Sequence, residues 1–353
     1  MSFLNNLRWR LVGRFAPFFR GPDPRHVRQR NIWHLYQDLL WLGLATAAAN
    51  YINVYAIRLG ASEQLIGLRT AIPSLLMVLL RIPAARLTER TPDRKGLIVR
   101  SLFAGRIIYL LIFLLPWLAL LPVLGQIPQA TLFILLVILM GVPQVLSAAG
   151  WDSFFADVVP GQRRARVVSM RNTFTNLISL TMVPLMGSFL EWAPFPLNYQ
   201  VVFLLAFIGA MISTWHVQAI KADPVPEART KHPPLSISEA RAILRESPSF
   251  AWLVGGTFIY QWAISIASPI FSIYFVEQLG ASESWIGWRM TLASLMSIVA
   301  YRVWPRQIER RGEVKMLRLA SPMMALFPLL TGLTRTLTPH LFIVLVPRFF
   351  GSC

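Results

Sequence analysis

Acidic side chains are scarce inside the long apolar segments of this chain, and those that occur there are the first candidates for chemistry. Setting aside Glu63 and Glu283, which begin two predicted helices, only Asp38 and Asp152 fall within such segments. An ionisable group in an apolar environment is costly and by default marks an ion or substrate pathway. A carboxylate held there can bind and release a proton, so Asp38 is a candidate for proton exchange.

The neighbours of Asp38 leave two hypotheses open. Its helical face carries small or polar side chains apart from one leucine: His34, Leu42, Ala45, Ala49 and Asn53. This face either lines a water-filled cavity, or it packs against another helix while Asp38 caps the inner helix end and pairs with His34 one turn away.

Among the arginines within apolar segments, the candidates are the repeated pair Arg69 and Arg289, and Arg106 in the third segment. Each either extends its long side chain back to the membrane interface, or attracts an anion or an acid at a central cavity. The uncharged candidates for a solute pocket are Asn50, Asn53, Gln144, Tyr260 and Gln261. A single polar group of this kind more often bonds to a neighbouring helix than to a ligand.

Motifs for phosphate-binding loops, zinc and nucleophile elbows are missing from the sequence. The five histidines are scattered, and the single cysteine, Cys353, excludes a disulfide framework and a thiolate metal site. The sequence therefore predicts no enzyme, no metal and no cofactor, and any transport would be driven by a solute or ion gradient.

Composition points to a protein surrounded by lipid. Hydrophobic residues make up 55% of the 353 residues and charged residues 14%, against about 25% charged in soluble domains. Segments of the length that spans a bilayer recur along the chain. They lie near 31–57, 63–85, 97–121, 130–156, 166–189, 197–219, 249–275, 283–301 and 315–332, and a tenth starts near 338.

The net charge of +18 is an orientation signal. When the connections are assigned alternately to two sides, one side holds 27 of the 34 Lys and Arg, and the opposite connections hold only Arg58 and Arg335. Basic loops stay on the cytoplasmic side. We therefore expect a multi-pass protein of the cytoplasmic (inner) membrane with a cytoplasmic N-terminus, and no nucleic-acid partner. Residues 1–30 read either as a basic amphipathic helix at the interface or as a disordered basic tail.

One stretch of the chain occurs twice. LGASEQLIGLR, at 59–69, recurs as LGASESWIGWR at 279–289, and further matches continue at the same offset of 220 residues. A repeat of this kind indicates two copies of one structural unit. We predict a bundle of six spans at 31–220, a cytoplasmic linker at 221–248, and a second bundle at 249–353 that enters the membrane in the same orientation.

Within the repeat, the residue types predict local structure. Ser62 and Ser282 can cap the following helices, whose first turns carry an acid that the helix dipole favours. Gly67 and Gly287 are small residues at which another helix can approach closely.

Two loops carry a family resemblance. ARLTERTPDRK, at 85–95, and PRQIERRGEVK, at 305–315, resemble the signature loop of the major facilitator superfamily. Both depart from it, since Glu89 and Glu309, which precede Arg90 and Arg310, replace its aspartate. The resemblance implies an all-α polytopic membrane protein of two parallel six-helix repeats, with a solute site between them and alternating access as the mechanism.

The resemblance also implies a conformational switch. In the family, an acid at the end of the fourth span bonds to the arginine of the signature loop and locks one state. Here that pairs Arg90 with Asp157, or alternatively with Asp152, and the switch candidates are Glu89, Arg90, Asp152, Asp157, Glu309 and Arg310.

The second copy is predicted to be incomplete, because position 353 corresponds to position 133 of the first. Much of the tenth span and the whole of the last two would be absent. The expected function is secondary active transport of a small organic solute, with protons as candidate coupling ions. The mixed polar and aromatic candidates favour export. The alternatives are uptake of a sugar-like or anionic metabolite, or an inactive membrane fragment.

Overall fold

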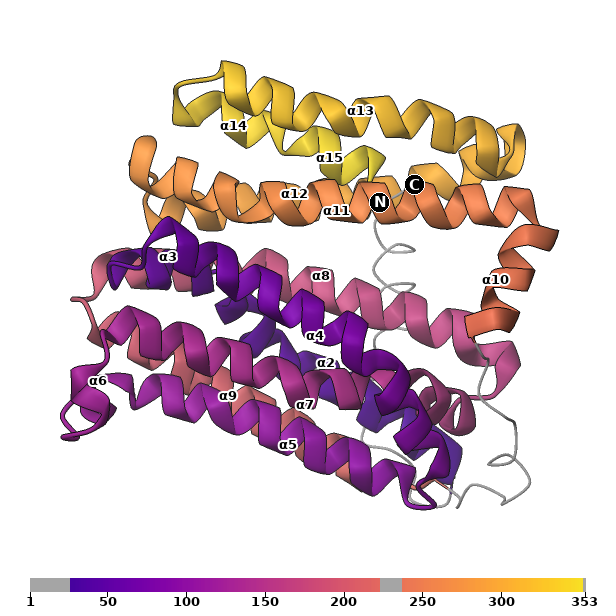
Figure 1. Cartoon of the computed structure of the whole chain (residues 1–353), viewed down its shortest axis with the longest axis horizontal. Coiled ribbons are helices and arrows are strands. Elements are labelled where there is room, and N and C mark those ends of the chain that lie inside the picture. Colours follow the sequence, from indigo (N-terminus) through magenta and orange to yellow (C-terminus); the bar gives the residue numbers. More distant parts are fainter. Residues whose placement is uncertain (1–25, 223–236, 352–353) are drawn as a thin grey trace, which may run out of the picture.

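The first half of the chain is a bundle of long helices (Figure 1). The computed structural model describes residues 26–222 and 237–351, so the predicted segment at 1–30 lies almost wholly outside the described residues. The helices of this half are α2 (Val27–Ala49), α3 (Ile52–Arg58), α4 (Glu63–Arg90), α5 (Arg94–Phe113), α6 (Leu115–Leu118), the short 3₁₀ turn η1 (Leu124–Gln126), α7 (Gln129–Val158), α8 (Gly161–Trp192) and α9 (Leu197–Ala219).

The second half forms a layer beside this bundle (Figure 1). A short helix within the predicted linker, α10 (Ile237–Glu246), leads into it. The remaining elements are α11 (Pro248–Ile273), the π-helix η3 (Tyr274–Gln278), α12 (Glu283–Arg311), α13 (Glu313–Leu333), α14 (Leu337–Ile343) and α15 (Leu345–Phe350). The described residues contain no strand, and the fold is that of an all-α polytopic membrane protein.

Eight helical segments among the described residues are long and apolar enough to cross a bilayer. Six of them lie in single helices, namely α4, α5, α7, α8, α9 and α13. The other two each combine consecutive elements, α2 with α3 and α11 with η3. The predicted span at 283–301 is not among them, although α12 is 29 residues long. Its polar residues include Arg289, Arg302 and Arg306, which lower its hydropathy.

The duplicated sequence forms the same turn in both halves. Gly60 and Gly280 have φ of 82° and 64°, a left-handed conformation that glycine adopts without steric cost. The Ser62 side chain then accepts a hydrogen bond from the Leu65 amide at 3.3 Å, and Ser282 accepts one from the Trp285 amide at 3.2 Å. Both predicted caps are confirmed. We call the end of the molecule with these turns the turn end, and the end with α10 the linker end.

The two caps give a direct test of this duplicated turn. Replacing Ser62 or Ser282 with alanine removes an acceptor for an amide at the first turn of a long helix, which costs about 1 kcal/mol in other proteins. We expect each variant to lower the free energy of unfolding in mixed micelles by about that amount. Thr46→Ala is the control, because its exposed hydroxyl bonds only to a helix carbonyl.

The halves approach most closely where α8 crosses α12 near the turn end. A Cβ added at Gly187 would lie 2.6 Å from the Glu283 carbonyl oxygen, and one at Gly287 would lie 3.0 Å from the Pro184 Cα. The Tyr51 hydroxyl fills the same contact and donates to the Val183 carbonyl at 2.7 Å. The predicted close approach is therefore confirmed at Gly287. At Gly67 it is wrong, because no described atom of another helix lies within 4 Å of an added Cβ.

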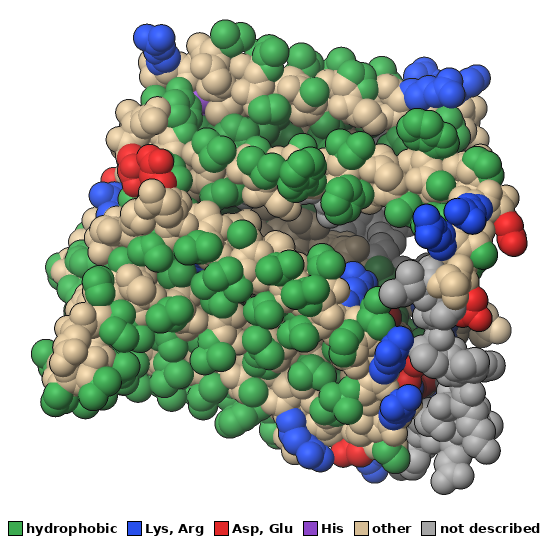
Figure 2. Space-filling view, in the orientation of Figure 1, with side chains coloured by type: hydrophobic (Ala, Val, Ile, Leu, Met, Phe, Trp, Pro, Cys, Tyr) green, Lys and Arg blue, Asp and Glu red, His purple; other side chains and the backbone are tan. Residues whose placement is uncertain are grey.

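The opposite end is less tightly packed. Figure 2 shows a hollow between the two halves toward the linker end, and Lys and Arg side chains gather around that end. The rest of the visible surface is largely apolar, as a lipid-facing surface requires. The structure is thus closed at the turn end and hollowed toward the linker end.

Candidate functional site

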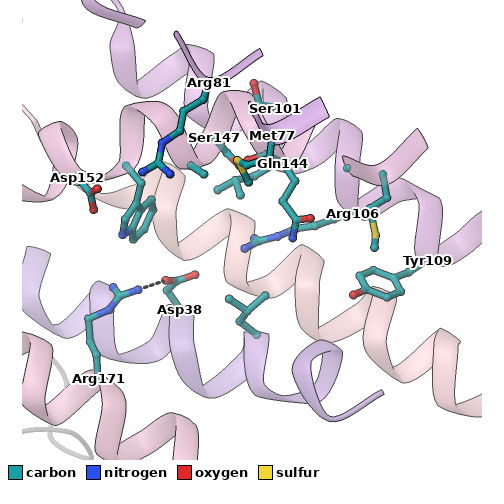
Figure 3. A pocket seen from close by; sticks show the side chains of 16 residues that line it. Asp38, Met77, Arg81, Ser101, Arg106, Tyr109, Gln144, Ser147, Asp152 and Arg171 are labelled. Atoms are coloured by element: carbon teal, nitrogen blue, oxygen red, sulfur yellow. Dashed lines mark hydrogen bonds and ion pairs between the residues drawn. The ribbon is translucent and has the colours of Figure 1, made fainter. Parts of the chain in front are cut away.

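A cavity of about 480 Å³ lies among α2, α4, α5, α7 and α8 of the first bundle. Its volume is within the usual range for small-molecule sites. Its walls combine apolar side chains with charged and polar ones (Figure 3): Asp38, Leu42, Met77, Arg81, Ser101, Leu102, Gly105, Arg106, Tyr109, Met140, Gln144, Ser147, Ala148, Trp151, Asp152 and Arg171. Three arginines face two carboxylates, so the cavity carries a formal excess of positive charge.

Asp38 is the most deeply buried charge of the cavity, with 2% of its side chain exposed. Its Oδ2 accepts a hydrogen bond from Arg171 Nη2 at 3.4 Å, and its Oδ1 accepts one from the Ser213 hydroxyl at 2.5 Å. The predicted local pairing with His34 is wrong, because His34 turns to His216 on α9 instead. The prediction that this face lines a cavity is confirmed for Asp38 and Leu42 only.

Arg171 is held in place by more than its ion pair. Its guanidinium lies 5.1 Å from the centre of the Trp151 ring and 5.8 Å from that of Phe155. It also donates to the Leu35 carbonyl at 3.4 Å. Sequence reasoning missed this residue because it counted Arg171 among the 27 basic residues assigned to the cytoplasmic side. These cation–π contacts hold the guanidinium in addition to its ion pair with Asp38.

Arg106 lies deeper along the same cavity, on α5. Its Nη1 donates to the Ala210 carbonyl at 3.0 Å and to the Thr214 hydroxyl at 2.7 Å, both on α9. The residue is 8% exposed, so the interpretation of Arg106 as an interfacial side chain is wrong. Figure 3 shows Arg106 and Gln144 pointing toward one another across the cavity, and Asp152 at its other side with Arg81 and Arg171.

Other predicted pocket residues lie away from the cavity. The Asn50 amide bonds to its own helix, at the Thr46 carbonyl. The Asn53 amide bonds to the Ser272 hydroxyl of α11 at 2.9 Å and so joins the two halves. Tyr260 is 42% exposed on α11, and Gln261 lies on the same helix with a side chain outside the described ones.

The two repeated arginines also lie outside this cavity. Arg69 donates to the Thr70 hydroxyl at 3.4 Å. The Arg289 guanidinium stacks 4.6 Å from the centre of the Phe275 ring and 5.9 Å from that of Phe327. Arg289 is therefore held by aromatic rings inside the second half.

At the linker end, the acid of the predicted conformational switch pairs with an arginine other than Arg90. Asp157 Oδ2 accepts from Arg94 Nη1 at 3.0 Å, so the predicted pairing of Asp157 with Arg90 is wrong. The reason is geometric, since Arg94 begins α5 and also bonds to the Thr88 carbonyl. Asp152 lines the cavity. The other candidates, Glu89, Arg90, Glu309 and Arg310, are exposed at helix ends.

An ion pair that was not predicted closes the turn end between the halves. Arg58 at the end of α3 donates from Nε and Nη2 to the two carboxylate oxygens of Glu283, at 3.0 and 3.2 Å. The Tyr199 hydroxyl donates to the same carboxylate at 3.0 Å, and the Glu283 side chain is 8% exposed. The sequence held one signal for this pair. Arg58 is one of the two basic residues in the connections opposite the cytoplasmic side, and it lies close in sequence to Glu63, which recurs as Glu283.

Comparison with solved structures supports this fold. The chain is similar to a bacterial homologue of the human lysosomal transporter Spinster in an inward-facing, unoccupied conformation, with 15% identity and a TM-score of 0.59 over 94% of this chain and 74% of the other. It is also similar to a D-xylose–proton symporter, with 16% identity and a TM-score of 0.51 over 90% of this chain and 79% of the other.

Comparison of sequences leads to the family. A Deinococcus radiodurans protein described as a "Putative sugar efflux transporter" is 25% identical over 265 residues, which cover 74% of this chain. The match spans 64% of that relative's length. The model of the Major Facilitator Superfamily matches residues 39–352. This match covers most of the described helices and the whole of the cavity apart from Asp38, and the chain belongs to the Major Facilitator Superfamily.

Proposed function

We propose that this chain is a secondary transporter that exports a small organic solute across the cytoplasmic membrane in exchange for protons, by alternating access. The observation that carries the proposal is the Asp38 carboxylate, buried at the wall of a solute-sized cavity and paired with Arg171 and Ser213. An intramembrane carboxylate with a single arginine partner can change its charge without unfolding its surroundings, because the arginine has aromatic contacts of its own.

Exchange follows from competition for this carboxylate. A solute hydroxyl or amine that donates a hydrogen bond to Asp38 stabilises the ionised form and so expels the proton. A proton that binds Asp38 abolishes its ion pair with Arg171 and leaves the solute only a weaker hydrogen bond to a neutral group. Proton and solute therefore occupy the site alternately, and inward flow of protons drives outward flow of solute.

The arrangement of the halves supplies the two access states. The positive-inside rule puts the linker end, with most Lys and Arg, in the cytoplasm. Solute would then reach the cavity from the cytoplasm through the hollow at that end, while Arg58, Glu283 and Tyr199 close the turn end. Rocking of the halves would open the turn end and close the linker end.

Two solute classes have support. A neutral, hydroxyl-rich solute suits a cavity lined by Gln144, Ser101 and Ser147 together with aromatic rings, and the Deinococcus relative is named for sugar efflux. An anionic solute is the second candidate, because Arg81, Arg106 and Arg171 outnumber the carboxylates at the cavity.

A screen followed by transport tests the proposal. The purified chain is screened by thermal shift against neutral mono- and disaccharides and against sugar acids and sugar phosphates of matched size. Each stabilising solute is loaded into proteoliposomes and its efflux is followed with and without an inwardly directed proton gradient. We expect efflux to accelerate with the gradient, and the lumen that the solute leaves to become more acidic as protons enter it in exchange. Efflux that ignores the gradient would contradict exchange with protons.

A further inference from the structure

The seam between α2 and α9 contains a row of buried polar pairs that the solute cavity does not include. At the linker end, the Asn31 amide donates to the Lys221 carbonyl at 2.6 Å and its oxygen accepts from the Lys221 amide at 3.0 Å. One turn further, His34 Nδ1 lies 3.0 Å from His216 Nδ1. One more turn brings Asp38 and Ser213 together. The row runs from the cytoplasmic surface to the coupling carboxylate.

The histidine pair is enclosed rather than open to the cavity. His34 is 7% exposed and His216 is 5% exposed. Trp33 and Trp215 pack against the two rings with their planes steeply tilted, at centroid distances of 4.8 to 6.1 Å. Neither histidine lines the solute cavity, and no residue of α9 does. A proton that travels along this seam therefore reaches Asp38 from behind, without passing the solute.

We propose that His34 and His216 form a proton-binding pair that carries protons from the linker end to Asp38 by a route separate from the solute's. The inference rests on proton exchange at Asp38, as proposed above. In the neutral pair, one ring donates its Nδ1 proton to the Nδ1 lone pair of the other, and the donor's Nε2 remains a free acceptor. A proton taken up at this Nε2 makes an imidazolium with a charge-assisted hydrogen bond to its partner.

The second step returns the pair to its starting state. The imidazolium releases its Nε2 proton to the Asp38 carboxylate, which becomes a carboxylic acid, and the neutral pair is restored. Residues four apart on a helix have Cβ atoms about 5–6 Å apart, a gap that one water or the Ser213 hydroxyl spans. The reverse sequence returns the proton when solute displaces it from Asp38.

The charges around the histidine pair favour transfer of its extra proton to Asp38. The charged groups that lie in the seam or bond to its residues are Arg30 and Asp38 on α2, Lys95 and Arg106 on α5, Arg171 on α8, and Lys221 after α9, and Asp38 is the one acid among them. Glu191, the other acid on these helices, lies at the turn end of α8. These cations disfavour a second positive charge on the pair, whereas the single carboxylate attracts the proton onward. Protons therefore leave the pair toward Asp38 rather than stay on it.

The test measures how fast Asp38 gains its proton. The full chain in lipid nanodiscs is subjected to a rapid drop in pH, and the carbonyl band of the protonated Asp38 carboxyl is followed by time-resolved infrared spectroscopy, with Asp38→Asn assigning the band. The double variant His34→Gln with His216→Gln keeps a hydrogen-bonding pair across the seam but has no group that binds a proton. His340→Gln is the matched control, a buried histidine of α14 that bonds to the Thr334 carbonyl.

We expect the double variant to slow the rise of the band by about 100-fold, the lower range of what a positioned proton-transfer group provides. The pH at half-protonation should change little, and His340→Gln should match the wild type. A merely structural role would lower thermal stability but leave the rate alone. His34→Gln alone serves if the double variant does not fold, with a smaller slowing expected. An unchanged rate in a folded variant overturns the proton route. A wild-type chain whose Asp38 never titrates overturns the proton exchange itself.

Discussion

Asp38→Asn is expected to abolish the effect of a proton gradient on transport while leaving solute exchange in place. The amide has nearly the shape of the carboxylate and still accepts from Ser213, but it cannot bind a proton. Net efflux driven by the gradient should fall to the level seen without a gradient. Counterflow, in which labelled solute enters in exchange for unlabelled solute, moves no net protons and should persist.

The matched control is Asp152→Asn, at the other acid of the cavity. Asp152 is exposed, so it is already solvated and its charge is not tied to a buried partner. We expect this variant to keep its response to the gradient. An Asp38→Asn variant whose efflux still accelerates with the gradient would remove Asp38 from the coupling mechanism.

Glu283→Gln is expected to open the turn end. The substitution removes the charge from a carboxylate that holds Arg58 through two hydrogen bonds and Tyr199 through a third. Hydrogen bonds to charged groups contribute about 1.5–3 kcal/mol each. A loss of about 2 kcal/mol shifts the balance between the two states roughly 30-fold. The change is measured as the rate at which a cysteine in place of Val183, a buried and larger side chain at the same contact, reacts with a membrane-impermeant reagent, in a chain with Cys353 replaced by serine.

The repeat supplies the control for this experiment. Glu63 occupies the same place in the first copy, but it is exposed, and the position that corresponds to Arg58 in the second copy is Gln278. Glu63→Gln should therefore leave the labelling rate unchanged. Equal effects of the two substitutions would mean that the acids act only at the first turns of their helices, and the ion pair would not be a gate.

The sequence was sufficient for features that depend on local pattern. Hydropathy, the duplicated turn and the serine caps at Ser62 and Ser282 follow from spacing and residue type alone. Asp38 could also be singled out as a candidate cavity residue, because an acid in an apolar segment is rare. Gln144 and Arg106 reached the cavity as expected for polar residues within spans.

Partners could not be predicted, because they depend on how helices distant in sequence face one another. Asp38 bonds to residues 133 and 175 positions away, and His34 to one 182 positions away. Arg171 looked like one more cytoplasmic charge until α8 was seen to bring it beside Trp151. The Arg58–Glu283 pair was hidden because it joins the two copies, and the corresponding pair, Gln278 with Glu63, has no cation. A repeat directs attention to residues that both copies share.

The most direct test of the account follows both ends of the molecule at once. Spin labels at Leu87 and Val314 report the linker end, and labels at Trp192 and Leu333 report the turn end; all four positions are exposed. Pulsed electron–electron double resonance measures the distance within each pair of labels at neutral and at acidic pH, in the wild type and in Asp38→Asn. We predict that acidification changes the two distances in opposite directions, and that Asp38→Asn shows the acidic distribution at every pH. Distances that change in the same direction, or a variant that still responds to pH, would contradict proton-controlled alternating access.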